Sequence, residues 1–125
     1  MFNAIHHVAI IGKDYARSKH FYVDLLGFRV LREHHRAARG DDKIDLACGE
    51  QEIELFIIKD APARPSYPEA QGLRHLAFRV ESVDDTVKIL NARGIATEPV
   101  RIDDYTGEKM TFFSDPDGLP LEIHE

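Results

Sequence analysis

The chain has 125 residues and a formal net charge of −6, with 16 Lys and Arg against 22 Asp and Glu. This acidic balance argues against a nucleic-acid partner, which requires a basic face, and no apolar run approaches the roughly 20 residues that a membrane span needs. The single cysteine, Cys48, cannot form an internal disulfide. The composition therefore predicts a cytoplasmic protein with no nucleic-acid or membrane partner.

The first half of the chain combines one helix pattern with several strand patterns. Asp14 is typical of a helix N-cap, and Gly27 suits the position that ends the same helix. Alternating apolar residues on either side of this helix indicate strands. The predicted strands of this half cover residues 5–11, 28–33, 44–48 and 52–58.

The second half repeats this plan after a segment at 61–72 that is rich in proline and reads as a linker. Ser82 and Asp85 match the spacing of a capping box, and Gly94 ends the predicted helix. Each half is thus one strand, one helix and three further strands, a βαβββ unit. The predicted strands of this half cover residues 73–80, 95–101, 109–114 and 119–124.

An internal repeat relates the two halves at an offset of 68 residues. At this offset His7 falls on His75 and Glu54 falls on Glu122, each within a predicted strand and between similar apolar neighbours. One repeated spacing among so many acids and histidines can arise by chance, but shared strand positions and flanking residues make chance a poor explanation. The repeat predicts that the two halves present the same pair of side chains.

The alternation of the strands predicts which face carries these four residues. His7 and His75 share their strand faces with small alanines, whereas bulky apolar residues alternate to the other face. Two neutral imidazoles and two carboxylates suit a divalent first-row metal. The residues therefore predict one metal ion per site, with Zn, Ni or Co favoured and Mn or Fe(II) as alternatives, bound by His7, Glu54, His75 and Glu122.

Three segments resemble the vicinal oxygen chelate superfamily, which includes glyoxalase I, and most closely its YaeR-like branch of small bacterial proteins. They are His-His-Val-Ala-Ile at 6–10, Gly-Leu-Arg-His-Leu-Ala-Phe at 72–78 and Asp-Pro-Asp-Gly-Leu-Pro-Leu-Glu-Ile at 115–123. The resemblance covers nearly the whole chain. It implies an α+β fold in which two βαβββ modules form a curved mixed sheet around a metal-binding cleft. The single domain 1–125 would comprise module one at 4–60, the linker 61–72 and module two at 73–125.

The resemblance also implies a reaction. Glyoxalase I fills a fourth metal position with a carboxylate or an amide, as Glu54 would here, and dioxygenases and fosfomycin-modifying enzymes of this fold usually have two His and one Glu. A lyase or isomerase of the glyoxalase I type follows, in which proton transfer next to a carbonyl passes through an enediolate. Glu122 and Glu54 are the candidate catalytic bases; the resemblance favours Glu122, whereas the residues themselves leave the two equivalent.

Other functions within the same fold stay open. The alternatives are a metal-dependent dioxygenase or thiol transferase and a non-catalytic protein that binds an antibiotic. The expected partners are a small-molecule substrate with vicinal oxygens and a second copy of the chain in a homodimer, and the site can form within one chain or across that dimer. Candidate substrate-binding residues are Arg36, Tyr105 and Lys109. Phe56 shares the face of Glu54 and predicts a more apolar pocket than that of bacterial glyoxalase I.

Overall fold

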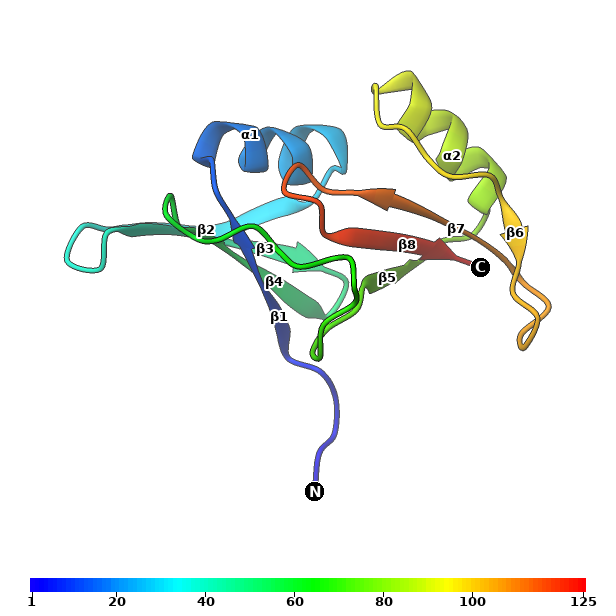
Figure 1. Ribbon diagram of the computed structural model, residues 1–125, viewed down its shortest axis with the longest axis horizontal. Coiled ribbons are helices and arrows are strands. Elements are labelled where there is room, and N and C mark those ends of the chain that lie inside the picture. The colour runs from blue at the N-terminus through cyan, green and yellow to red at the C-terminus, as the bar shows by residue number, and fades with distance from the viewer. The chain divides into compact units, whose positions relative to one another are not determined.

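A computed structural model describes all residues from Met1 to Glu125, which divide into two compact units, Met1–Pro62 and Ala63–Glu125 (Figure 1). The boundary falls inside the segment that the sequence marks as a linker. Each unit has its own sheet and helix. None of the helices is both long enough and apolar enough to cross a membrane.

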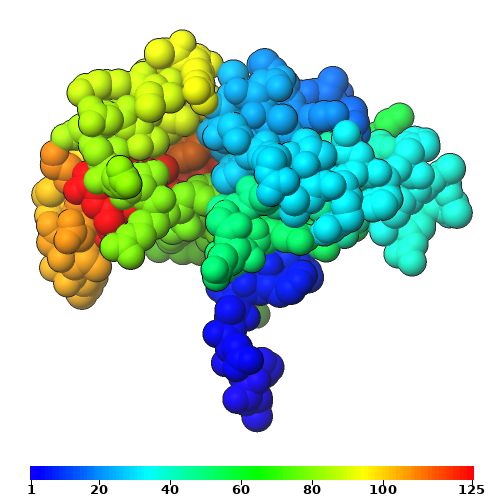
Figure 2. Space-filling view, turned by 180° about the vertical axis from the view of Figure 1, so that it is seen from behind, coloured from blue at the N-terminus to red at the C-terminus, as the bar shows by residue number.

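The first unit is a four-stranded mixed sheet with one helical segment. Its strand order is β1-β4-β3-β2, where β1 and β4 are parallel and the other neighbours are antiparallel. Residues 1–6 precede β1 and project from the unit as an exposed arm (Figure 2). The elements are β1 His7–Gly12, α1 Tyr15–Lys19, the π-helical segment η1 His20–Leu25, β2 Arg29–Arg36, β3 Asp41–Cys48 and β4 Gln51–Ile57.

The second unit repeats this topology, with strand order β5-β8-β7-β6 and a parallel β5–β8 pair. Both units are therefore βαβββ in mixed sheets, and the predicted α+β class is confirmed. The elements are β5 Leu76–Arg79, α2 Val83–Ala92, β6 Arg101–Ile102, β7 Lys109–Ser114 and β8 Pro120–His124.

The strand predicted at 95–101 is wrong in extent, because only Arg101 and Ile102 are in β6. Ile95 belongs instead to the end of α2. Its backbone N–H donates to the carbonyl of Leu90 at 2.9 Å, and both side chains are buried next to Gly94, whose φ is 80°. This pairing of a positive-φ glycine with a following apolar residue is the Schellman type of helix end.

Both helices begin at the predicted caps. A side-chain oxygen of Asp14 accepts the N–H of Arg17 at 2.7 Å, and the hydroxyl of Ser82 accepts the N–H of Asp85 at 3.2 Å. We expect Asp14→Ala and Ser82→Ala each to lower the free energy of unfolding by about 1 kcal/mol, because each leaves a helical N–H without its acceptor. Urea denaturation measures this loss. Asp14→Ser should retain most of the stability, and equal losses in Asp14→Ala and Asp14→Ser would contradict the cap.

The strands place the candidate ligands by burying their neighbours. On β8, Leu121 and Ile123 are buried on one face, and Ile53 and Leu55 do the same on β4. The intervening residues, Glu122 and Glu54 among them, are held on the opposite face. The apolar alternation of the sequence is thus what fixes the direction of both carboxylates.

Candidate metal centre

The first unit brings His7 and Glu54 together. His7 opens β1, and Glu54 lies in β4 opposite Ala9, two residues further along β1. The Nε2 atom of His7 is 3.6 Å from Oε2 of Glu54, and the His7 side chain is 42% exposed. The pair is therefore accessible and has its nitrogen and oxygen donors adjacent.

The second unit brings His75 and Glu122 together in the same way. Glu122 lies in β8 opposite Ala77, two residues beyond His75. The Nε2 atom of His75 is 2.8 Å from Oε2 of Glu122, and the His75 ring meets the Phe112 ring edge-on at 5.1 Å between centroids. The Glu122 side chain is only 8% exposed. The repeat in the sequence is thus a repeat in register and in contacts.

Each unit supplies two of the four predicted ligands, and no group of three or more His, Cys, Asp or Glu side chains lies together as a metal site. The donors still fit a divalent metal. Glu122 is a buried carboxylate whose neighbour is a histidine, with no Lys or Arg paired to it. A buried negative charge without a cationic partner is costly, so a metal ion would compensate it.

The His7–Glu54 pair has charged neighbours that are not among the residues predicted from the sequence. Lys43 of β3 donates to Oε1 of Glu54 at 2.8 Å and lies 3.0 Å from Oδ1 of Asp45. Burial of Asp45 acts to raise its pKa, but attraction from Lys43 and Arg32 outweighs burial and holds that pKa below its usual range. The hydrogen bond to Glu54 raises the pKa of Lys43. A signal was present in the sequence, because Lys43 and Asp45 alternate with buried Ile44 and Leu46.

The three candidate substrate-binding residues lie in different surroundings. Arg36 forms an ion pair with Asp41 and stacks over the Phe56 ring, 5.0 Å from its centroid, which places it on the face of Glu54. Tyr105 is in an exposed turn, and Lys109 is paired with Asp84 at the start of α2. Since Lys43 also lies over Phe56, the surroundings of this ring are more charged than the sequence predicts.

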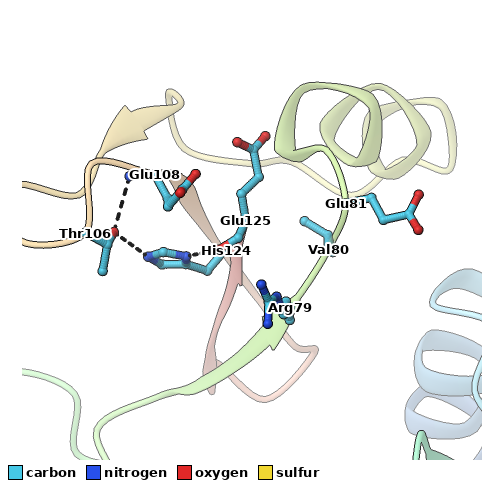
Figure 3. Close-up of a pocket in the computed structure, with 7 residues that line it drawn as sticks. All are labelled: Arg79, Val80, Glu81, Thr106, Glu108, His124 and Glu125. Atoms are coloured by element: carbon cyan, nitrogen blue, oxygen red, sulfur yellow. Dashed lines mark hydrogen bonds between the residues drawn. The ribbon is translucent and has the colours of Figure 1, made fainter.

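The second unit also contains an open cavity of about 600 Å³ (Figure 3). Arg79 and His124 continue the faces of His75 and Glu122 along β5 and β8, and they are partners in the register. A hydrogen bond to the Glu125 carbonyl, with further help from Asp103, raises the pKa of His124. The lining residues are Arg79, Val80, Glu81, Thr106, Glu108, His124 and Glu125.

Comparison with known proteins identifies the family of the chain. The model of the glyoxalase/bleomycin resistance protein/dioxygenase superfamily matches residues 4–123. The chain belongs to this superfamily. It is 53% identical to the YwkD protein of Bacillus subtilis, with 100% of this chain and 98% of that protein covered. It is 52% identical to the YaeR protein of Escherichia coli, with 97% and 95% covered.

Solved structures confirm the fold. A glyoxalase family protein from Enterococcus faecalis is 61% identical and superposes with a TM-score of 0.95, with 99% of this chain and 98% of that one covered. More distant relatives differ in activity. The metallothiol transferase FosB of Staphylococcus saprophyticus is 29% identical over 99% of this chain and 78% of its own length. A lactoylglutathione lyase from Agrobacterium tumefaciens, 24% identical with a TM-score of 0.74 and 98% and 92% covered, shares the fold.

Proposed function

We propose that the protein is a metal-dependent lyase or isomerase of the glyoxalase I type, with His7, Glu54, His75 and Glu122 as the metal ligands. The observation that supports this most is the repeated His–Glu pair at equivalent register positions in the two units. The proposed substrate is a small molecule with vicinal oxygens. The expected metal is Zn, Ni or Co, with Mn or Fe(II) as alternatives.

The donor set accounts for the choice of metal and for its charge. Neutral imidazoles and carboxylates bind borderline divalent ions well. The formal charge of two carboxylates balances that of a divalent ion in a partly buried site. When bound, such an ion supplies Lewis acidity that stabilises negative charge developing on a carbonyl oxygen.

Proton transfer requires a carboxylate with a free oxygen near the substrate. Glu54 has neither oxygen free, because Oε1 accepts from Lys43 and Oε2 faces His7. Glu122 contacts His75 through Oε2, and no hydrogen bond or ion pair engages its Oε1. We therefore assign the base to Glu122, with the proton held at Oε1 before it is returned to the substrate.

A thiol transferase is the second candidate, because similarity to FosB extends over 99% of this chain. Glu54 argues against this candidate. Fosfomycin-modifying enzymes of this fold usually bind their metal through two His and one Glu, whereas this chain has two His and two Glu as candidate ligands. The two reactions also differ in substrate. A thiol transferase consumes a free thiol, whereas the isomerase rearranges one substrate.

Elemental analysis and assay test the proposal. Protein purified without chelators or added metal should contain about one divalent first-row metal ion per pair of units. The metal-loaded protein should form lactoylglutathione or isomerise a related α-hydroxycarbonyl compound, with no oxygen uptake on catechols and no thiol addition to fosfomycin. Thiol addition would favour the second candidate. Absence of metal, even after incubation with Zn²⁺, Ni²⁺, Co²⁺, Mn²⁺ or Fe²⁺, would exclude both.

A further inference from the structure

The two candidate carboxylate ligands have different neighbours. In the first unit, Oε1 of Glu54 accepts a hydrogen bond from Lys43 at 2.8 Å, whereas Oε2 is directed to His7 at 3.6 Å. Only Oε2 therefore lies beside His7, the other candidate ligand in this unit. A cation that bound both oxygens of Glu54 would have to displace the Lys43 ammonium.

Lys43 is fixed by its surroundings. Its side chain is 18% exposed, and its ammonium lies 3.0 Å from Asp45 and 5.5 Å from the centroid of the Phe56 ring. Asp45 is itself buried, and Arg32 donates to its second oxygen at 2.8 Å. Lys43 is thus held between two carboxylates, unlike a lysine that moves freely at the surface.

The second unit has no counterpart to this lysine. Asp45 is opposite Glu54 in the β3–β4 register, and Phe112 is opposite Glu122 in the β7–β8 register. Two residues before Asp45 is Lys43, and two residues before Phe112 is Met110. The second unit therefore has the apolar residues Met110 and Phe112 where the first unit has Lys43 and Asp45. The two units share a His–Glu pair but differ in the charge beside it.

We infer that Lys43 is a positioning residue that restricts Glu54 to binding the metal through one oxygen and makes it the weaker of the two carboxylate ligands. This inference rests on the proposed function. An ammonium at hydrogen-bond distance competes with a metal ion for the carboxylate and repels that ion. Glu122, which has no such competitor, is the stronger ligand of the two.

Calorimetric titration of the full-length, chelator-treated protein with Zn²⁺ tests the role of Lys43. We expect Lys43→Met to tighten Zn²⁺ binding about tenfold, because it removes a competing positive charge. Lys43→Arg, which retains the charge, should stay within about threefold of wild type. Lys88→Met is the matched control, since it removes the same charge from an exposed ion pair with Asp85 and should leave the affinity unchanged.

A double-mutant cycle separates an action through Glu54 from a general effect of charge. In a Glu54→Gln background, the gain from Lys43→Met should fall to about threefold or less. An unchanged affinity in Lys43→Met, or the same gain in both backgrounds, would overturn the inference. A wild-type protein that binds no divalent ion would instead overturn the proposed function, and this inference with it.

A second comparison leaves Lys43 in place, so that a folding defect in Lys43→Met cannot obscure the result. Glu54→Gln should weaken Zn²⁺ binding about tenfold less than Glu122→Gln, because Glu54 already shares its charge with the ammonium. Circular dichroism confirms that each variant is folded before titration. Equal losses in these two variants would contradict the inference.

Discussion

His75→Ala and His7→Ala should each weaken binding of Zn²⁺ by more than about 100-fold. Under the proposed function each change removes one of four metal ligands, and loss of even a supporting partner of a ligand typically costs 10–100-fold. The two histidines lie in different units. An equal requirement for both is therefore expected only where both units contribute to one site. Titration calorimetry on chelator-treated protein, together with metal content after purification, measures the effect.

His20→Ala is the control for these variants. His20 is exposed in η1, where Asp24 lies 2.8 Å from its ring nitrogen, and it is not a predicted ligand. Its replacement should leave Zn²⁺ binding unchanged. If His75→Ala abolishes binding and His7→Ala does not, the site is confined to the second unit, and the four-ligand proposal is wrong.

The sequence predicts the two His–Glu pairs because two independent regularities agree at these residues. The offset of 68 residues selects His7, Glu54, His75 and Glu122, and the strand alternation gives both members of each pair a common face. Parallel pairing of β1 with β4, and of β5 with β8, then brings His and Glu into contact. A repeat carries information about register that no single histidine or glutamate carries alone.

Lys43 is harder to predict, for a physical reason. A lysine in an alternating strand is usually the solvated residue of that strand. Its role depends on Asp45 and Glu54 lying beside it, and on Arg32 reaching Asp45 from β2. These contacts join residues of three strands, and a bulge between Val30 and Arg32 shifts the register of one of them. Single-strand periodicity does not encode that shift.

At the end of α2, by contrast, the sequence predicts a strand that is mostly absent from the structure. Ile95, Thr97 and other residues of 95–101 have the composition of a strand, but the glycine before them already ends the helix. The backbone N–H of Ile95 donates to the carbonyl of Leu90 instead, and both side chains are buried. Pro99 has no N–H to donate to a neighbouring strand. Local propensity indicated a strand, and tertiary packing at the helix end took precedence.

Glu122→Gln should lower turnover by about 100-fold or more on whichever compound of the assay panel is converted. The amide has nearly the same shape, but it cannot take a proton at the position of Oε1, and a positioned base contributes 10²–10⁴-fold to rate. The assay is run at saturating metal, because the substitution also weakens a proposed ligand. Steady-state kinetics, with metal content measured on the same sample, gives the effect on turnover alone.

Glu54→Gln is the matched variant, since it makes the same chemical change in the other unit. Under saturating metal it should lower turnover by less than about tenfold, because Lys43 already engages the oxygen that would otherwise accept a proton. A large loss in Glu54→Gln with full turnover in Glu122→Gln would transfer the role of base to Glu54. The two carboxylates have different neighbours: an ammonium contacts Glu54, whereas the histidine beside Glu122 contacts an aromatic ring. We therefore expect the larger loss of turnover in Glu122→Gln.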